Sequence, residues 1–219
     1  MIEEKRIPAF VVRISYDIIA EETPNAEALN RVLTLAGLDR YIDHPPPMDN
    51  SPAISQREFE KMVGMVWQVF DDIQAREIFR RTGVRGFENL TRSGALAFTQ
   101  FLRAFDGLGT KRERAAMALS RLTDELSRAM GYQHVFRREG EDFLLDIHQC
   151  PYCAELLHRP NATPIAHFCH VPTAFYEAAI NWASGDPHTV QEISCRVTSP
   201  DQDYCRFKVF WNVGLKRKV

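Results

Sequence analysis

The residues best suited to chemistry in this 219-residue chain are its five cysteines, which all lie in the last third. They are Cys150, Cys153, Cys169, Cys195 and Cys205. Thiolates bind zinc and related metals, and a thiol with a lowered pKa can act as a nucleophile or as half of a redox pair. Because five is an odd number, the cysteines cannot all be paired in disulfides. Their clustering therefore predicts metal binding or thiol reactivity.

Cys195 and Cys205 stand at equal distances from Pro200, in the middle of the turn-forming segment TSPDQD. If this turn joins two neighbouring strands, the two cysteines lie directly opposite each other, with Cβ atoms about 4.5–5.5 Å apart. Two thiolates at that separation can share one zinc ion, since each zinc–sulfur bond is about 2.3 Å long. The pair thus predicts half of a zinc site.

Cys169 and Glu192 are the candidates for the other half. Together with the pair they form the pattern C-x22-E-x2-C-x9-C, which supplies three thiolates and one carboxylate. Tetrahedral zinc accepts such a set. Residues three apart on a regular strand point to opposite faces of a sheet. Glu192 and Cys195 can therefore bind one ion only near a bulge or a strand end.

Cys150 and Cys153 form a C-x2-C pair, in the sequence CPYC, that has three readings. It can supply two ligands to a metal, it can be a redox pair at a helix N-terminus, or it can be two small buried residues. In the first reading, the coordination would be completed by Cys169 and one histidine from His148, His167 and His170. The spacing alone leaves all three readings open.

The bulk composition is that of an ordinary globular protein, with 45% hydrophobic and 26% charged residues. A formal net charge of −2 gives no support to nucleic-acid binding. The N-terminus MIEEKRIPAF lacks the apolar core of a signal peptide, and no apolar run reaches the roughly 20 residues of a membrane span. We therefore expect a cytoplasmic protein, in which cysteines stay reduced.

Helical signals dominate up to about residue 130. Thr23, as N-cap, and Gly37, as stop, predict one helix, and the proline-rich segment HPPPMDNSP predicts a rigid linker after it. Residues 10–20 are ambiguous between strand and helix. Capping boxes at Ser55 and at Thr110, each with a glutamate three residues later, predict helices over 55–82, ending before Gly83, and over 110–131. A further helix is expected over 87–106.

Strand signals begin after residue 130. Alternating apolar residues on either side of a turn at 139–141 predict a hairpin, a helix follows from Pro172 to Gly185, and two strands flank the TSPDQD turn. The expected fold is therefore α+β: N-terminal helices followed by a roughly four-stranded antiparallel sheet with one inserted helix. Residues 1–50 are predicted to be a helical extension, suited to dimerisation, and 51–219 the main domain, with a cysteine-rich metal region at 148–207.

The last 50 or so residues resemble the 4-vinyl-reductase-like family of small-molecule-binding domains, and the rest of the chain resembles it more weakly. The matching features are Cys169, a helix over 173–185, Glu192-x2-Cys195 and Cys205-Arg206-Phe207. This family shares a fold with phenol-sensing domains of bacterial activators and with TRAPP subunits. The phenol sensors hold a structural zinc, so the resemblance implies a zinc site at Cys169, Glu192, Cys195 and Cys205.

Two features depart from that family pattern. The turn between the last two cysteines usually contains glycine, whereas TSPDQD has none. The CPYC pair is also outside the pattern and resembles predicted ring-opening hydrolases similar to aminothiazoline carboxylate hydrolase. These departures leave the subfamily open between sensor and enzyme.

A ligand pocket in such a domain would lie between the helices and one face of the sheet. The candidates to line it are the aromatic side chains of the helical half, together with one strand histidine: Trp67, Phe70, Phe98, Phe101, Phe105 and His134. Aromatic residues at helical spacing more often belong to a plain core than to a pocket, and a lone strand histidine is more often structural. No catalytic base is identified.

Three functions compete. The first is a binding or sensing module for a hydrophobic or aromatic molecule, such as a tetrapyrrole, with structural zinc and a separate output partner. The second is an enzyme: a vinyl reductase of (bacterio)chlorophyll synthesis with a reductase partner, or a hydrolase that uses the cysteine or metal site. The third is a tether. The sequence contains no Ser/His/Asp motif, P-loop or dinucleotide fingerprint, which favours the first function.

Overall fold

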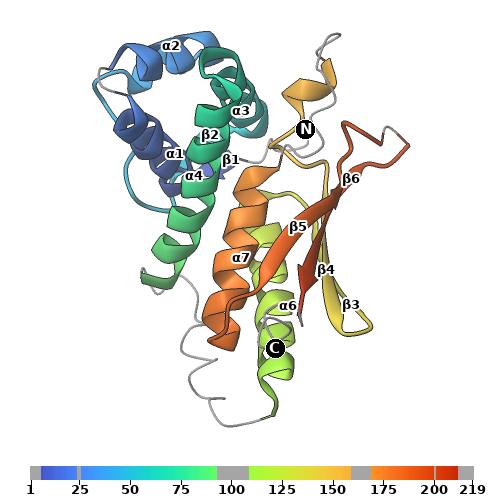
Figure 1. Cartoon of the computed structure of the whole chain (residues 1–219). Coiled ribbons are helices and arrows are strands. Elements are labelled where there is room, and N and C mark those ends of the chain that lie inside the picture. The colour runs from blue at the N-terminus through green and yellow to red at the C-terminus, as the bar shows by residue number, and fades with distance from the viewer. Residues whose placement is uncertain (1–5, 24–25, 93–108, 159–168, 200, 212–219) are drawn as a thin grey trace, which may run out of the picture.

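The computed structural model describes residues 6–23, 26–92, 109–158, 169–199 and 201–211. Within these ranges the predicted α+β architecture is confirmed: helices come first, and a four-stranded antiparallel sheet follows with one helix inserted between its two hairpins (Figure 1). The helices of the first part are α1 (Ala9–Glu22), α2 (Glu27–Ala36), α3 (Gln56–Val69), α4 (Asp72–Arg92) and α6 (Lys111–Met130). None of the described helices is long and apolar enough to cross a membrane.

The ambiguous segment near the start of the chain is helical. A short strand, β1 (Arg6–Pro8), pairs antiparallel with β2 (Pro52–Ser55), and the chain then enters α1. Helix α1 buries Val12, Ile18 and Ile19 and packs against α4. The segment is a helix and not a strand because one apolar stripe of it is buried against a neighbouring helix.

The predicted start of the next helix is wrong, whereas its end is confirmed. Thr23 lies at the C-terminal end of α1 and its hydroxyl donates to the carbonyl of Ile19 at 3.2 Å, so it does not cap α2. Helix α2 begins at Glu27 after Ala26. It ends at Gly37, whose φ of 76° gives the left-handed conformation that glycine adopts readily. The short 3-10 helix η1 (Asp39–Tyr41) follows.

The single helix predicted over 55–82 is wrong, because two helices, α3 and α4, cover this stretch. The capping box that opens α3 is present, with the amide of Glu58 donating to Ser55 Oγ at 3.2 Å. The helix stops at Phe70, whose ψ of 154° is extended. Asp71 then accepts hydrogen bonds from the backbone amides of Ile73 and Gln74, both at 2.9 Å. Its carboxylate therefore caps the start of α4.

The prediction that a helix ends before Gly83 is wrong. Gly83 lies inside α4, where this helix crosses α7 (His170–Ser184). A Cβ added at Gly83 would stand 2.3 Å from the carbonyl oxygen of Val171. The missing side chain thus allows the two helix backbones to approach closely. The helix predicted over 87–106 is the end of α4 as far as Arg92, and its remainder lies outside the described residues.

The sheet has the strand order β3-β4-β6-β5 and is antiparallel throughout. Its strands are β3 (His134–Glu139), β4 (Asp142–His148), β5 (Thr189–Ser194) and β6 (Tyr204–Phe210). Both predicted hairpins are confirmed. Helices α6 and α7 lie along one side of the sheet, and α1 to α4 lie beyond α7 (Figure 1). The side chains of Tyr176 on α7 and Phe207 on β6 meet in the core between helix and sheet, with ring centroids 5.9 Å apart.

Candidate metal centre and ligand cavity

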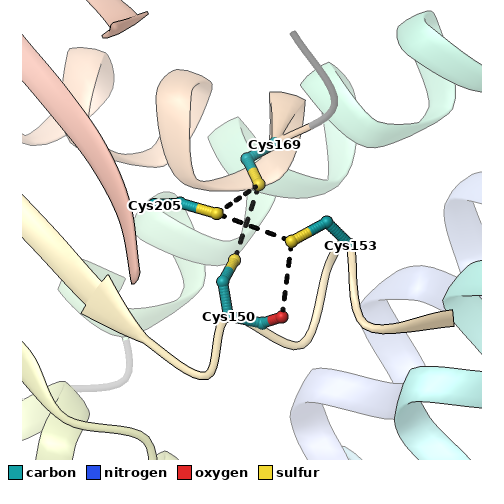
Figure 2. Close-up of side chains that lie close together, drawn as sticks. All are labelled: Cys150, Cys153, Cys169 and Cys205. Carbon is teal, nitrogen blue, oxygen red and sulfur yellow. Dashed lines mark hydrogen bonds between the residues drawn. The ribbon is translucent and has the colours of Figure 1, made fainter. Parts of the chain in front are cut away.

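The five cysteines converge from four separate segments. Cys150 and Cys153 lie on the loop after β4, which turns at Gln149 with a φ of 51° and leads into the 3-10 helix η2 (Glu155–His158). Cys169 is the N-cap of α7, Cys195 directly follows β5, and Cys205 is on β6. Figure 2 shows four of these side chains pointing toward one another from the loop, the helix start and the strand. All five are buried free thiols.

The distances between the sulfur atoms fit metal coordination. Cys150 and Cys169 are 3.5 Å apart, as are Cys153 and Cys205, and Cys169 and Cys205 are 3.6 Å apart (Figure 2). Cys195 and Cys205 are 3.7 Å apart. With zinc–sulfur bonds of about 2.3 Å, the edge of a tetrahedral site is about 3.8 Å. The thiols therefore already stand at the spacing that tetrahedral zinc requires.

The strand register places Cys195 and Glu192 as the proposed zinc pattern demands. Ser194 pairs with Arg206, so the following residue, Cys195, comes opposite Cys205. Glu192 lies on the buried face of β5, opposite Phe207, and the register shift that follows it brings Cys195 to the same side. The amide of Cys169 donates to Glu192 Oε2 at 3.2 Å. The ligand atoms of Cys169, Glu192, Cys195 and Cys205 lie within 4.8 Å of one another.

Cys150 and Cys153 belong to a second set of four. Their sulfur atoms and those of Cys169 and Cys205 also lie within 4.8 Å of one another. The CPYC pair, whose three readings the spacing leaves open, thus lies at the same cluster as the other cysteines. No local signal relates Cys153 to Cys205, because 52 residues separate them.

Burial shapes the electrostatics of the cluster. It raises the pKa of Cys150 to about 11 and raises the pKa of Cys169 above its ordinary value. Hydrogen bonds from Cys150 and the other thiols lower the pKa of Cys205. Burial also raises the pKa of Glu192 to about 7. A bound divalent cation would favour the thiolates and the carboxylate, because metal ligation deprotonates thiols.

The candidate histidines lie elsewhere. His148 Nδ1 is 3.1 Å from Asp203 Oδ1, and His170 packs near Trp67, with ring centroids 6.1 Å apart. Neither belongs to the sets of potential ligands found among the described residues. His167 lies outside the described residues.

A cavity of about 400 Å³ lies between α1, α4, α6, α7 and the sheet, beside the cysteine cluster. Its walls are largely apolar, with Phe10, Val11 and Ile14 from α1 and Leu122 and Leu126 from α6 among them. Pro151 and Tyr152, the two residues between Cys150 and Cys153, also line it. The cysteine-bearing loop therefore forms part of the cavity wall.

The polar residues of the cavity wall include Arg6, Asn50 and Glu125, and two others that form a hydrogen-bonded pair. His134 Nδ1 lies 2.7 Å from the hydroxyl of Tyr176, and both residues line the cavity. Burial lowers the pKa of His134 to about 3 and raises that of Tyr176. The imidazole and the phenol are therefore both uncharged at neutral pH, which suits a mostly apolar ligand with one hydrogen-bonding group.

The other described residues of the predicted pocket, unlike His134, do not line the cavity. Trp67 and Phe70 are buried but do not line the cavity, and the ring of Trp67 is 5.2 Å from that of Phe79. Phe98, Phe101 and Phe105 lie outside the described residues. Sequence reasoning missed the α1 residues and the tyrosines of the cavity, because nothing local in the sequence indicates that α1 faces the sheet domain.

Comparison with known proteins shows the fold alone. No protein-family profile and no curated protein matches the sequence. An H-NOX protein from S. oneidensis in the Fe(II)NO ligation state has a TM-score of 0.54 and 8% identity, covering 93% of this chain and 98% of that one. A double variant of the H-NOX protein designated Tt has a TM-score of 0.51 and 11% identity, covering 93% of each chain.

A trafficking protein particle complex subunit 3 from Naegleria fowleri, covalently bound to palmitic acid, has a TM-score of 0.48 and 11% identity, covering 70% of this chain and 90% of that one. The H-NOX likeness confirms the predicted α+β fold. The resemblance to the 4-vinyl-reductase-like family stays a prediction.

Proposed function

We propose that this chain is a binding or sensing module for a hydrophobic small molecule, with zinc at the cysteine centre as a structural staple. The observation that carries the proposal is the apolar cavity of about 400 Å³ with the His134–Tyr176 pair in its wall. Its volume is within the usual range for small-molecule sites. The module would act in the cytoplasm, belong with the 4-vinyl-reductase-like domains, and pass its signal to a separate partner.

The position of the cysteines supports a structural role for the metal. Cys169, Glu192, Cys195 and Cys205 are all buried, and four protein ligands would close a tetrahedral site. A catalytic zinc site instead keeps one position open for water or substrate. Cys150 and Cys153 are also buried and directed at the other thiols, so they are poorly placed to attack a molecule in the cavity.

The metal would also support the cavity. Pro151 and Tyr152 reach the cavity from the loop that Cys150 and Cys153 anchor. A loop of this kind has little regular structure of its own, so its position depends on what its cysteines bind. Zinc would thus keep the wall in place and reduce the entropic cost of ligand binding.

Probe binding tests the cavity. We expect the apolar fluorophore 1-anilinonaphthalene-8-sulfonate to bind the folded protein, and a competing ligand of suitable shape to displace it. The competitors would be phenol, a long-chain fatty acid and the tetrapyrrole hemin. Val11→Trp should fill the cavity and weaken binding at least about tenfold, because Val11 is in its wall.

The matched control is Val84→Trp on α4, at a side chain that is 38% exposed and outside the cavity wall. It should bind the probe like the wild type. Melting curves of both variants exclude unfolding as the cause. Equal probe binding by Val11→Trp and the wild type would count against the cavity as the ligand site.

A further inference from the structure

The cluster offers more ligands than one tetrahedral metal ion can use. Five thiols and the carboxylate of Glu192 are buried together, whereas zinc in a structural site takes four ligands. An ion bound by Cys150, Cys153, Cys169 and Cys205 would leave Cys195 and Glu192 beside it. An ion bound by the other set would leave Cys150 and Cys153 unused.

We infer that the centre holds two divalent metal ions, zinc by its donor chemistry, that share Cys169 and Cys205 as bridging thiolates. This inference rests on the metal centre of the proposed function and extends it. One ion takes Cys150 and Cys153 as its terminal ligands, and the other takes Cys195 and Glu192. Every member of the cluster then coordinates metal.

The two sets of four have the geometry of two tetrahedra with a common edge. Cys169 and Cys205 are the members of both sets, and their sulfur atoms are 3.6 Å apart. Cys150 and Cys153 each lie 3.5 Å from one of these two sulfurs. Cys195 lies 3.7 Å from Cys205, and Glu192 Oε2 accepts the amide hydrogen of Cys169. Both terminal pairs therefore adjoin the bridging pair.

The charge balance permits the second ion. One divalent ion with four anionic ligands has two negative charges in excess, and two divalent ions with six anionic ligands have the same excess. The second ion thus neutralises the two added ligands without increasing the buried charge. The remaining negative charge lies at the N-terminus of α7, where Cys169 is the N-cap and the helix dipole is positive.

Each ion would then link different parts of the fold. The first joins the loop after β4 to α7 and β6, and the second joins the end of β5 to the same two elements. Loss of one terminal pair should release one ion and leave the other. Loss of a bridging thiolate should weaken both sites.

Metal stoichiometry tests this arrangement. We would load reduced, metal-free protein with zinc, remove the excess and count bound zinc by native mass spectrometry and elemental analysis. The wild type should hold two ions per chain, Cys153→Ala and Cys195→Ala one each, and Cys205→Ala fewer than either. Ser194→Ala, next to Cys195 but outside both sets, is the control and should keep two.

Cobalt(II) gives a readout that needs no variant. Two cobalt ions bridged by thiolates couple magnetically, so the paramagnetic resonance signal should grow up to the first equivalent and fall with the second. The inference is overturned if the wild-type protein binds only one ion per chain and the loss of one of the two terminal pairs leaves that ion bound. It is also overturned by metal-free protein that contains disulfides within the cluster and takes up no metal after reduction.

The two proposals fail separately. Probe binding by a protein with one ion would leave the proposed ligand function standing and remove the dinuclear centre. Two ions in a protein whose cavity binds no probe or competitor would do the reverse.

Discussion

At the scale of single residues, the chemistry of the site depends on what burial does to ionisable groups. His134 and Tyr176 form an uncharged pair in the cavity, since desolvation disfavours both the imidazolium and the phenolate. In the cysteine cluster, the same burial favours thiols until a metal ion arrives. One physical effect thus keeps the cavity pair uncharged and disfavours thiolates in a cluster that holds no cation.

His134 should make the stability of the protein depend on pH. Its pKa is lowered from 6.5 to about 3 in the folded state, so between these values the unfolded chain binds more protons. The free energy of unfolding should therefore fall as the pH falls below about 6.5. His134→Gln should reduce this dependence, which urea denaturation of both proteins at pH 7 and pH 5 would measure. Equal losses of stability in the two proteins would contradict the assignment.

At the scale of secondary-structure elements, the contact between α4 and α7 is the one that most constrains the site. Helix α7 carries Cys169 at its start and Tyr176 on its cavity side, so its position sets both the metal centre and the cavity. Gly83 allows α4 to pack directly against its first turn. An error in this packing would displace both functional features together.

Substitution of Gly83 should therefore be costly. Gly83→Ala would bring a methyl group 2.3 Å from the carbonyl oxygen of Val171, and we expect a loss of about 1–3 kcal/mol in the free energy of unfolding from overpacking. Gly86→Ala is the matched control, because a Cβ there would meet its nearest neighbour, the ring of Phe175, at 3.6 Å. It should be neutral or stabilising by up to about 1 kcal/mol, since alanine favours helix.

Chemical denaturation of the two variants separates packing from helix propensity. Equal stability of Gly83→Ala and Gly86→Ala would show that the close approach of α4 and α7 has no energetic consequence.

At the scale of the whole molecule, the cysteine cluster lies where the sheet meets the helical layer. The loop after β4, the start of α7, the end of β5 and strand β6 meet at this cluster, and the loop continues into the cavity wall. The cavity of this H-NOX-like fold thus lies between the sheet and the helical layer, beside the cluster.

Removal of the metal should therefore loosen both the fold and the cavity. A chelator such as EDTA should lower the melting temperature by several degrees, because metal binding contributes directly to folding free energy. Probe affinity should decrease in parallel, since Pro151 and Tyr152 would lose their anchor. Readdition of zinc should restore both values. An unchanged melting temperature after verified metal loss would refute the structural role.

The sequence alone determined the features that depend on neighbours a few residues apart. The capping boxes at Ser55 and Thr110 mark two helix starts, and glycine ends the helices at Gly37, Gly131 and Gly185. The proximity of Cys195 and Cys205 was also expected from their equal distances to Pro200, and their sulfur atoms lie 3.7 Å apart.

Only the tertiary structure decided which distant segments meet. It brought Cys150 and Cys153 to Cys169 and Cys205, placed Cys195 on the same side as Glu192 through a bulge, and set α1 against the cavity. It also gave Gly83 a packing role in place of the predicted helix end. These features depend on how the surfaces of separate elements pack together. Residue spacing and periodicity describe only neighbours along the chain, so they do not reveal this packing.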